Sequence, residues 1–262
     1  KTGTLTQNRM TVVEHSTDDE KELMTAMAVC ADAKPGEDGA AVGEPTECAL
    51  VNDATEHGLT DAVGKYRRVG EAPFDSLRKM MSVVCDVGGE LIQFTKGAPD
   101  EVLKRCTRYL KNGEELPLTD SVRKEILAAN KTMADKALRV LCAARRSHES
   151  LPNVFEPQTL ENDLCYIGLS GMIDPIRPEV KDAIAKCREA GIRPVMITGD
   201  HKDTAAAIAL QLGIITDPSQ AITGAELDGI SDEEFAERVK YFSVYARVQP
   251  EHKVRIVNAW RA

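Results

Sequence analysis

The stretch GIRPVMITGDHKDTAAAIALQLG, residues 191–213, carries the pattern that decides the fold. A short apolar run from Arg193 to Thr198 is followed by a glycine and then by a helical pattern over 203–212, which ends at Gly213. Strand, glycine turn and helix in this order are typical of parallel α/β sheets, where ligands bind beyond the carboxyl ends of the strands. The stretch therefore predicts one strand–helix unit of such a sheet.

The same alternation continues on both sides of this stretch. Upstream, an apolar strand is predicted over 164–173, followed by a helix over 178–190 that opens with a proline. Downstream, a strand is predicted over 244–248 and a helix over 250–261. From about residue 164 onward, the sequence thus predicts a doubly wound parallel sheet.

The middle of the chain has a different character. Short β-rich runs follow one another, and the pair Gly88-Gly89 between two of them is a hairpin signal. The predicted strands are 10–13, 68–74, 82–87, 91–96 and 140–145, and the predicted helices are 18–31, 44–56, 99–110 and 119–138. This order predicts an α+β domain, built on an antiparallel sheet and inserted into the α/β domain.

Composition narrows the classes of partner. The chain has 262 residues and a net charge of -9, which disfavours binding to nucleic acid because like charges repel. Its 7 cysteines form no C-x-x-C pair, so we expect reduced, mostly buried thiols. No apolar stretch approaches the roughly 20 residues that cross a bilayer, so we expect no direct membrane insertion by this chain.

Two polar runs suggest phosphate chemistry. Thr198-Gly199-Asp200 follows a predicted strand and precedes a helix, where a hydroxyl and free backbone N–H groups can bind an anion. The alternative is a capped turn in which Asp200 or Asp203 is the N-cap. The run Lys1 to Thr6 also supplies hydroxyls and a glycine. Neither G-x-x-x-x-G-K-[ST] nor G-x-G-x-x-G occurs, so P-loop and ordinary dinucleotide folds have no support.

Seven segments resemble, in order along the chain, the motifs of P-type ATPases. They are Lys1-Thr2-Gly3-Thr4-Leu5-Thr6, Gly43-Glu44-Pro45-Thr46-Glu47, Phe74 to Val83, Lys96-Gly97-Ala98-Pro99, Asp174-Pro175-Ile176-Arg177, Thr198-Gly199-Asp200 and Ala246 to Lys253. The fuller pattern is similar to type II pumps, especially the calcium-pump branch.

This resemblance implies a fold and a division into domains. The α/β part would be a haloacid-dehalogenase-like doubly wound parallel sheet, incomplete here, with an inserted α+β nucleotide-binding domain on an antiparallel sheet. Residues 1–12 and 173–262 would form two segments of the phosphorylation domain. Residues 13–172 would form the nucleotide-binding domain.

The resemblance also implies roles for particular residues at a phosphate site. Thr198, Gly199 and Lys253 would hold the phosphoryl oxygens, Asp200 would order the site, and Thr2, beside Lys1, would help to place Mg²⁺. A phosphoryl group in transfer spreads charge over its oxygens, so such donors suit the chemistry. Without the motif, Lys253 would be read as an ordinary solvated lysine.

A second set of residues would bind ATP. In this set Phe74 would stack on adenine, Glu47 would face its amino group, and Lys96 would line the pocket. Arg139 would reach the phosphates, Arg247 would lie near the ribose, and Arg78 and Gly97 would complete the set. Without the motif, Phe74 would be read as a core aromatic residue.

The expected function is that of an ATP-driven cation pump that works through an aspartyl phosphate, with calcium favoured over manganese, sodium/potassium or protons as cargo. The nucleophilic Asp would precede Lys1, so this chain is expected to bind ATP without turnover. The actuator domain and membrane helices of the same pump would be its partners, at the cytoplasmic face of a membrane. Two alternatives remain: a free-standing haloacid-dehalogenase-type phosphatase, and a nucleotide-binding module without chemistry.

Overall fold

The computed structural model describes residues 3–36 and 39–261. The chain divides into two compact units. The large unit is Arg9–Ile173, and the small unit joins the N-terminal residues up to Asn8 to the segment from Asp174 onward.

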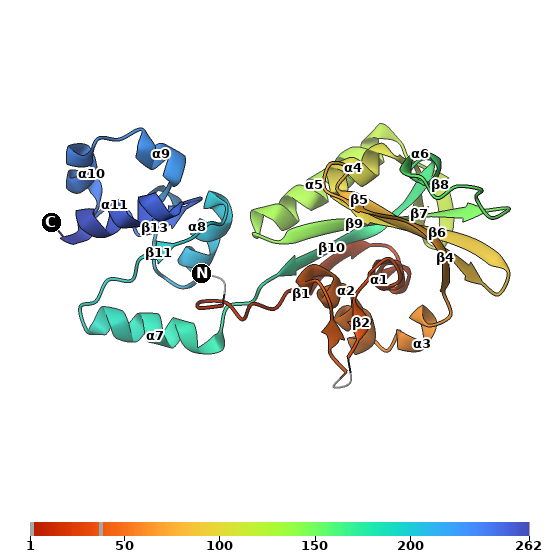
Figure 1. Ribbon diagram of the computed structural model, residues 1–262, viewed down its shortest axis with the longest axis horizontal. Coiled ribbons are helices and arrows are strands. Elements are labelled where there is room, and N and C mark those ends of the chain that lie inside the picture. Colours follow the sequence, from red (N-terminus) through yellow and green to blue (C-terminus); the bar gives the residue numbers. More distant parts are fainter. Residues whose placement is uncertain (1–2, 37–38, 262) are drawn as a thin grey trace. The chain divides into compact units, whose positions relative to one another are not determined.

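The large unit is built on an 8-stranded, mainly antiparallel sheet (Figure 1). Its strands in spatial order are β4 (Arg67–Asp75), β5 (Met80–Val87), β6 (Glu90–Gly97), β9 (Arg139–His148), β10 (Leu164–Ile173), β7 (Cys106–Lys111) and β8 (Glu114–Pro117). The remaining strand, β1 (Thr11–Thr17), pairs antiparallel with β10, whereas β7 runs parallel to it. A separate two-stranded ribbon joins β2 (Lys34–Pro35) to β3 (Ala41–Val42).

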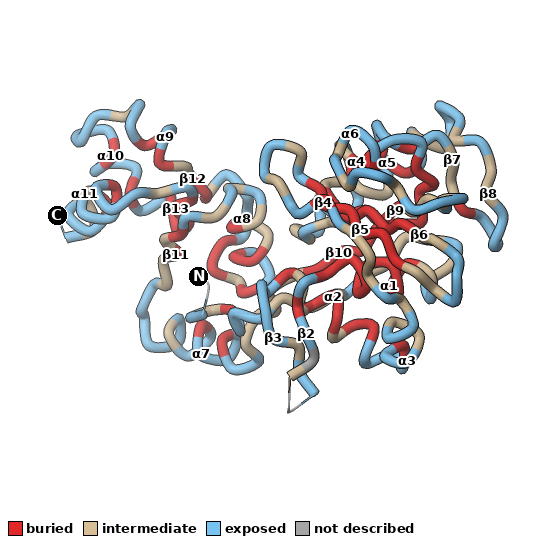
Figure 2. The backbone as a smooth tube through the Cα atoms, turned by 45° about the vertical axis from the view of Figure 1, so that its right-hand side comes forward, coloured by how far each residue is buried: buried red, intermediate tan, exposed pale blue. Residues whose placement is uncertain are grey.

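Helices cover both faces of this sheet, so its central strands are buried on both sides (Figures 1 and 2). On one face, α1 (Glu20–Val29) and α2 (Pro45–Glu56) form a core with alternate residues of β5, such as Val83 and Cys85. On the other face, α4 (Pro99–Lys104) and α5 (Asp120–Asp135) pack on β9 and β10. The short helices α3 (Thr60–Val63) and α6 (Pro157–Leu160) complete the unit.

The small unit contains a three-stranded parallel sheet in the order β11-β13-β12. These strands are β11 (Met196–Ile197), β12 (Ala221–Thr223) and β13 (Val244–Ala246). Helices α7 (Pro178–Glu189) and α8 (Lys202–Gln211) contribute to one core of this unit, and α9 (Gly224–Asp228), α10 (Asp232–Arg238) and α11 (Pro250–Arg261) contribute to the other. A single 3₁₀ turn, Pro218–Gln220, precedes β12.

The N-terminal residues of the small unit are fastened to the segment that leaves the large sheet. Thr6 is fully buried, and its hydroxyl donates to Asp174 Oδ2 at 2.6 Å. The guanidinium of Arg177 donates to the carbonyls of Thr6 and Gly3, both at 3.0 Å. The two segments through which the chain passes between the units are therefore hydrogen-bonded to each other within the small unit.

Two details of the sequence prediction were wrong. The sequence predicts that strand 164–173 begins the parallel alternation, but β10 pairs antiparallel with β1 and β9 in the large sheet. Its run is continuously apolar because helices cover both of its faces, which also happens in parallel sheets. The helix predicted over 99–110 ends at Lys104, and Cys106–Lys111 forms β7 instead. The inserted antiparallel sheet itself is confirmed.

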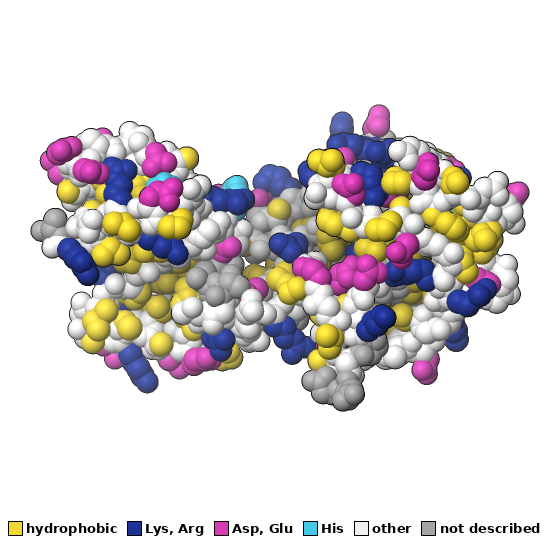
Figure 3. All heavy atoms as spheres, viewed as in Figure 1, with side chains coloured by type: hydrophobic (Ala, Val, Ile, Leu, Met, Phe, Trp, Pro, Cys, Tyr) yellow, Lys and Arg dark blue, Asp and Glu magenta, His cyan; other side chains and the backbone are white. Residues whose placement is uncertain are grey.

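Acidic and basic side chains are interspersed over the face of the molecule that Figure 3 shows. Many charged side chains of the described residues form ion pairs, such as Arg67 with Asp86 at 2.6 Å and Lys136 with Glu14 at 2.7 Å. Among the described residues, no helix is both long enough and apolar enough to cross a membrane.

Candidate functional site

Ligand pockets in proteins typically measure about 300–1,000 Å³, and the large unit contains a cavity of about 600 Å³. Several elements meet there: the segment after α1, the N-terminus of α2, the β4–β5 turn, the end of β6 and the start of β9. Its lining consists of Asp32, Glu44, Thr46, Glu47, Phe74, Lys79, Met81, Lys96, Gly97, Ala98, Arg139, Val140 and Leu141.

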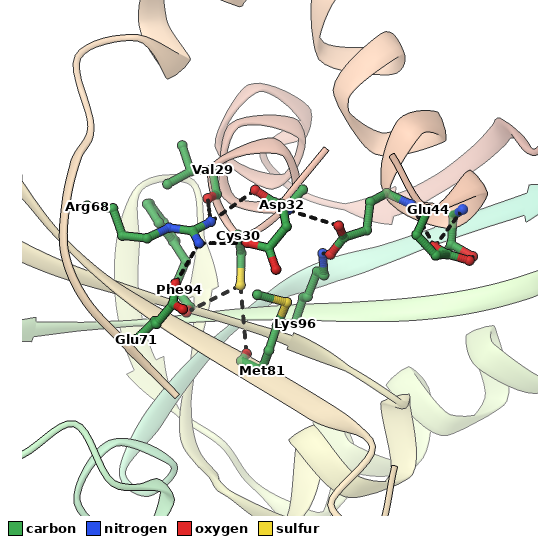
Figure 4. Close-up of polar contacts among 12 residues, drawn as sticks. Val29, Cys30, Asp32, Glu44, Arg68, Glu71, Met81, Phe94 and Lys96 are labelled. Atoms are coloured by element: carbon green, nitrogen blue, oxygen red, sulfur yellow. Dashed lines mark hydrogen bonds and ion pairs between the residues drawn. The ribbon is translucent and has the colours of Figure 1, made fainter. Parts of the chain in front are cut away.

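An ion pair forms part of the cavity wall. The ammonium of Lys96, from β6, lies 2.5 Å from Glu47 Oε1 of α2, and the two side chains are only 7% and 16% exposed. The other carboxylate oxygen of Glu47 accepts the backbone N–H of Asp32 at 2.9 Å. Both oxygens of Glu47 are thus engaged, which fixes the direction in which Lys96 presents its charge (Figure 4).

The N-terminus of α2 organises a second part of the wall. Glu44 is its N-cap, and Glu44 Oε2 accepts the backbone N–H groups of Thr46 at 2.8 Å and Glu47 at 3.1 Å. A carboxylate at this position is favoured by the helix dipole. The hydroxyl of Thr46 donates to Glu44 at 3.0 Å and accepts from the guanidinium of Arg139 at 2.8 Å. Arg139 is therefore oriented by hydrogen bonds that run from the N-cap Glu44 through the hydroxyl of Thr46.

The β4–β5 turn closes the cavity and needs a glycine opposite it. A Cβ at Gly97 would lie 2.4 Å from the carbonyl oxygen of Lys79 and 2.5 Å from Met80 Cβ, so a larger residue would force strands β5 and β6 apart. Lys79 itself has φ 55°, and its N–H donates to Asp75 O at 2.6 Å, which makes the turn tight. Phe74, at the start of this turn, is 62% exposed.

The lining combines apolar surface with charges of both signs. Phe74, Met81, Val140 and Leu141 can cover a flat apolar ring, and the cations Lys79, Lys96 and Arg139 can pair with an anionic chain. Residues of these types fit a nucleotide. Among the described residues, no group of three or more His, Cys, Asp or Glu side chains could form a metal site. Mg²⁺ commonly binds through substrate phosphates with few protein ligands, so this does not conflict with its arriving with a nucleotide.

The structure brings five of the predicted ATP-site residues to this cavity: Glu47, Phe74, Lys96, Gly97 and Arg139. Two others lie elsewhere. The guanidinium of Arg78 pairs with buried Glu161 and donates to the carbonyl of Pro73 at 2.7 Å. Arg247 belongs to the small unit.

Sequence reasoning missed several residues of the lining, notably Lys79, Thr46 and Asp32. A signal for Lys79 and Thr46 was present, because both lie within segments that resemble family motifs, Phe74 to Val83 and Gly43 to Glu47. Nothing in the sequence marked Asp32, which comes to the wall through its position just after α1.

A second polar cluster lies at the carboxyl ends of the parallel strands in the small unit. Thr198 follows β11, and it is 7% exposed. Its N–H donates to Tyr245 O at 2.9 Å, and its hydroxyl accepts the N–H of Asp200 at 3.1 Å. The backbone N–H of Arg247 donates to Asp200 O at 3.0 Å. A Cβ at Gly199 would meet nothing within 4 Å, so open space faces this residue.

Lys253 lies in the first turn of α11, and its neighbour His252 fixes that turn. Buried His252 accepts the backbone N–H of Gln249 at Nδ1 (2.9 Å), so its proton is on Nε2, which lies 3.0 Å from Asp228 Oδ1. Lys253 is exposed, and no ion pair involves it within residues 3–36 and 39–261. The predicted residues Lys1 and Thr2 lie outside the described part of the chain.

The comparisons with known proteins agree with this arrangement. A family model described as "P-type ATPase, cytoplasmic domain N" matches residues 19–179. The chain is 47% identical to "Calcium-transporting ATPase 1" of Bacillus cereus, with 100% of this chain and 31% of that protein aligned. It is 42% identical to "Calcium-transporting ATPase 1" of Lactococcus lactis, again over 100% of this chain and 31% of that protein.

A human protein is also similar. The chain is 35% identical to human "Calcium-transporting ATPase type 2C member 2", over 99% of this chain and 30% of the relative. The chain thus spans about a third of the length of the curated relatives that it matches. The matched model covers more than half of the chain and includes every residue that lines the cavity, so the chain belongs to the P-type ATPase family.

Proposed function

We propose that the cavity of the large unit binds ATP. The observation that carries this proposal is the meeting of an exposed aromatic ring, Phe74, with apolar walls and three cations in one cavity of about 600 Å³. Phe74 stacks on adenine, and the Glu47 carboxylate beside Lys96 faces the edge of the base. Arg139 and Lys79 pair with the phosphates. Arg78 acts from outside the cavity, by holding the turn that carries Phe74.

For the small unit we propose a role in phosphoryl transfer. Its parallel sheet would be part of a haloacid-dehalogenase-like doubly wound sheet, and its polar cluster would contact the transferred phosphoryl group. Thr198 and the N–H of Gly199 hold phosphoryl oxygens, Lys253 neutralises their charge, and Asp200 orders the loop. Lys1 and Thr2, with Mg²⁺, complete this set, and an aspartyl phosphate is the intermediate. The arrangement is supported by the open, hydrogen-bonded loop after β11.

For the whole protein we propose ATP-driven cation transport, with calcium as the cargo. The support is the printed names of the relatives, which are calcium-transporting ATPases. The actuator domain and membrane helices of the pump would be its partners, and this part would lie at the cytoplasmic face of the membrane. A free-standing phosphatase is not favoured, because residues 19–179 match a nucleotide-domain model of the pump family.

Calorimetric titration of ATP into wild type and Phe74→Ala tests the proposed binding. Stacking of a base on an aromatic side chain typically contributes about 1–3 kcal/mol, so we expect Phe74→Ala to weaken binding about tenfold or more. Leu77→Ala is the matched control, because Leu77 lies in the same turn, is 91% exposed and does not line the cavity. Equal affinity of wild type and Phe74→Ala, or no binding by wild type at millimolar ATP, would refute the proposal.

A further inference from the structure

We propose that Arg68 is a positioning residue of the ATP cavity, although its side chain is not part of the lining. It acts by fixing the segment after α1, whose backbone orients the Glu47–Lys96 pair. This inference rests on the proposed ATP-binding function, and it assigns to that site a residue one layer behind its wall.

Arg68, on β4, makes four hydrogen bonds from two nitrogens. One nitrogen donates to Asp32 Oδ1 and to Glu71 Oε2, both at 2.7 Å. The other donates to the carbonyls of Val29 at 3.2 Å and Ala31 at 2.9 Å. These carbonyls lie at and just beyond the C-terminus of α1, where a cation is favoured by the helix dipole. Arg68 thereby holds three positions of this segment, through the carbonyls of Val29 and Ala31 and the carboxylate of Asp32.

Asp32 transmits this constraint to the cavity through its backbone. Its side chain is bound to Arg68, and its N–H donates to Glu47 Oε2 at 2.9 Å. The opposite oxygen of Glu47 accepts from the ammonium of Lys96 at 2.5 Å. Figure 4 shows this chain of contacts, from Arg68 through Asp32 to the carboxylate beside Lys96. Each link is a charge-assisted hydrogen bond, the type that fixes geometry most strongly.

Loss of the Arg68 guanidinium would remove the first link in this series of hydrogen bonds. The side chain of Asp32 is 64% exposed, so water would replace Arg68 there without restoring its position. The Asp32 N–H would then no longer be held toward Glu47, and the carboxylate would orient Lys96 less well. A site that must be ordered during binding binds its ligand more weakly than one ordered in advance.

The neighbouring acid provides a control for general effects on folding. Glu71 lies on the same strand as Arg68 and forms an ion pair of the same length with it, but it has no link to the cavity. A purely structural role for Arg68 would make its two carboxylate partners equivalent. The proposed role makes only the Asp32 side important for ATP.

A double-mutant cycle on ATP affinity tests the proposal, with calorimetry on the full chain. Arg68→Ala should weaken ATP binding about tenfold in the wild-type background, since coupled network residues typically show such effects. In the Glu47→Ala background, the same change should cost less than about twofold, because the residue through which it acts is gone. Glu71→Gln should stay within about twofold of wild type. A tenfold loss in both backgrounds, or no loss in either, would overturn the proposal.

A measurement without ATP separates this inference from the proposed function. In ¹H–¹⁵N spectra of the ligand-free protein, the Asp32 amide should shift upfield in Arg68→Ala as its hydrogen bond to Glu47 lengthens, and should not move in Glu71→Gln. An unmoved Asp32 amide in Arg68→Ala would contradict the positioning role even if ATP binds. Failure of wild type to bind ATP would instead count against the proposed function. If Arg68→Ala does not fold, Arg68→Lys serves both arms, because it keeps the charge without the planar fork.

Discussion

The proposed ATP cavity of the large unit and the polar cluster of the small unit differ in how their residues are held. In the cavity, Lys96 is 7% exposed and paired, and Gly97 sits where no side chain would fit. In the small unit, Gly199 of the polar cluster faces open space, and Lys253, in the first turn of α11, is exposed. Packed and hydrogen-bonded neighbours hold Lys96 and Gly97 of the cavity in place, whereas Gly199 and Lys253 of the small unit remain accessible. This contrast suits the two roles proposed above, which are ligand binding in the cavity and phosphoryl transfer at the polar cluster.

The largest expected effect compares the two lysines. Lys96→Met would leave the Glu47 carboxylate partly buried without its cation, so we expect the free energy of unfolding of the large unit to fall by about 3 kcal/mol. Lys253→Met removes an exposed charge and should change stability by less than about 0.5 kcal/mol. Urea unfolding followed by circular dichroism measures both. Adding Glu47→Gln to Lys96→Met should recover part of the loss, and a failure to recover would mean that the stranded carboxylate is not the cause.

The location of each effect can be checked with one internal probe. The chain has a single tryptophan, Trp260, and it packs in the small unit against the core that contains Tyr245. Its fluorescence therefore reports on the small unit. The transition seen by Trp260 should be the same in wild type and Lys96→Met, and a shift in it would show that the destabilisation is not confined to the large unit.

A smaller effect compares the two glycines. Gly97→Ala would place a Cβ 2.4 Å from a backbone oxygen, so strands β5 and β6 must shift, at a cost of about 2 kcal/mol. Gly199→Ala meets nothing within 4 Å and should change stability by less than about 0.5 kcal/mol. The same unfolding experiment measures this pair. If Gly199→Ala proved as costly as Gly97→Ala, the loop after β11 would not be open, and the contrast between the two sites would fail.

The sequence predicted much of the fold because its patterns were local. The hairpin of β5 and β6 follows from two β-rich runs joined by Gly88-Gly89, and α8 follows from its strand–glycine–helix pattern. β10 was predicted in the wrong sheet. A continuous apolar run is typical of a parallel strand, and it also occurs in an antiparallel strand that helices cover on both faces. The short strands β7 and β8 carry no strong alternation, and β7 was absorbed into a predicted helix.

In the candidate site too, some residues could be predicted from local sequence patterns and others could not. Glu47, Phe74 and Lys96 could be predicted because each lies in a recognisable segment, and the structure brings them to one cavity. Arg68 and Asp32 could not, since their roles arise from contacts between residues 36 positions apart in sequence. Such links are set by tertiary packing, and no periodicity or short motif records them.

The most direct test of the account is an ATP titration followed by ¹H–¹⁵N spectroscopy of the full chain. If the cavity binds ATP, the amides of Thr46, Glu47 and Lys96 to Ala98 should move progressively, and pyrophosphate alone should shift far fewer of them. Phe74→Ala should reduce these shifts at equal ATP concentration. Shifts confined to residues outside the cavity, or unchanged spectra at millimolar ATP, would contradict the claim that this cavity is the nucleotide site.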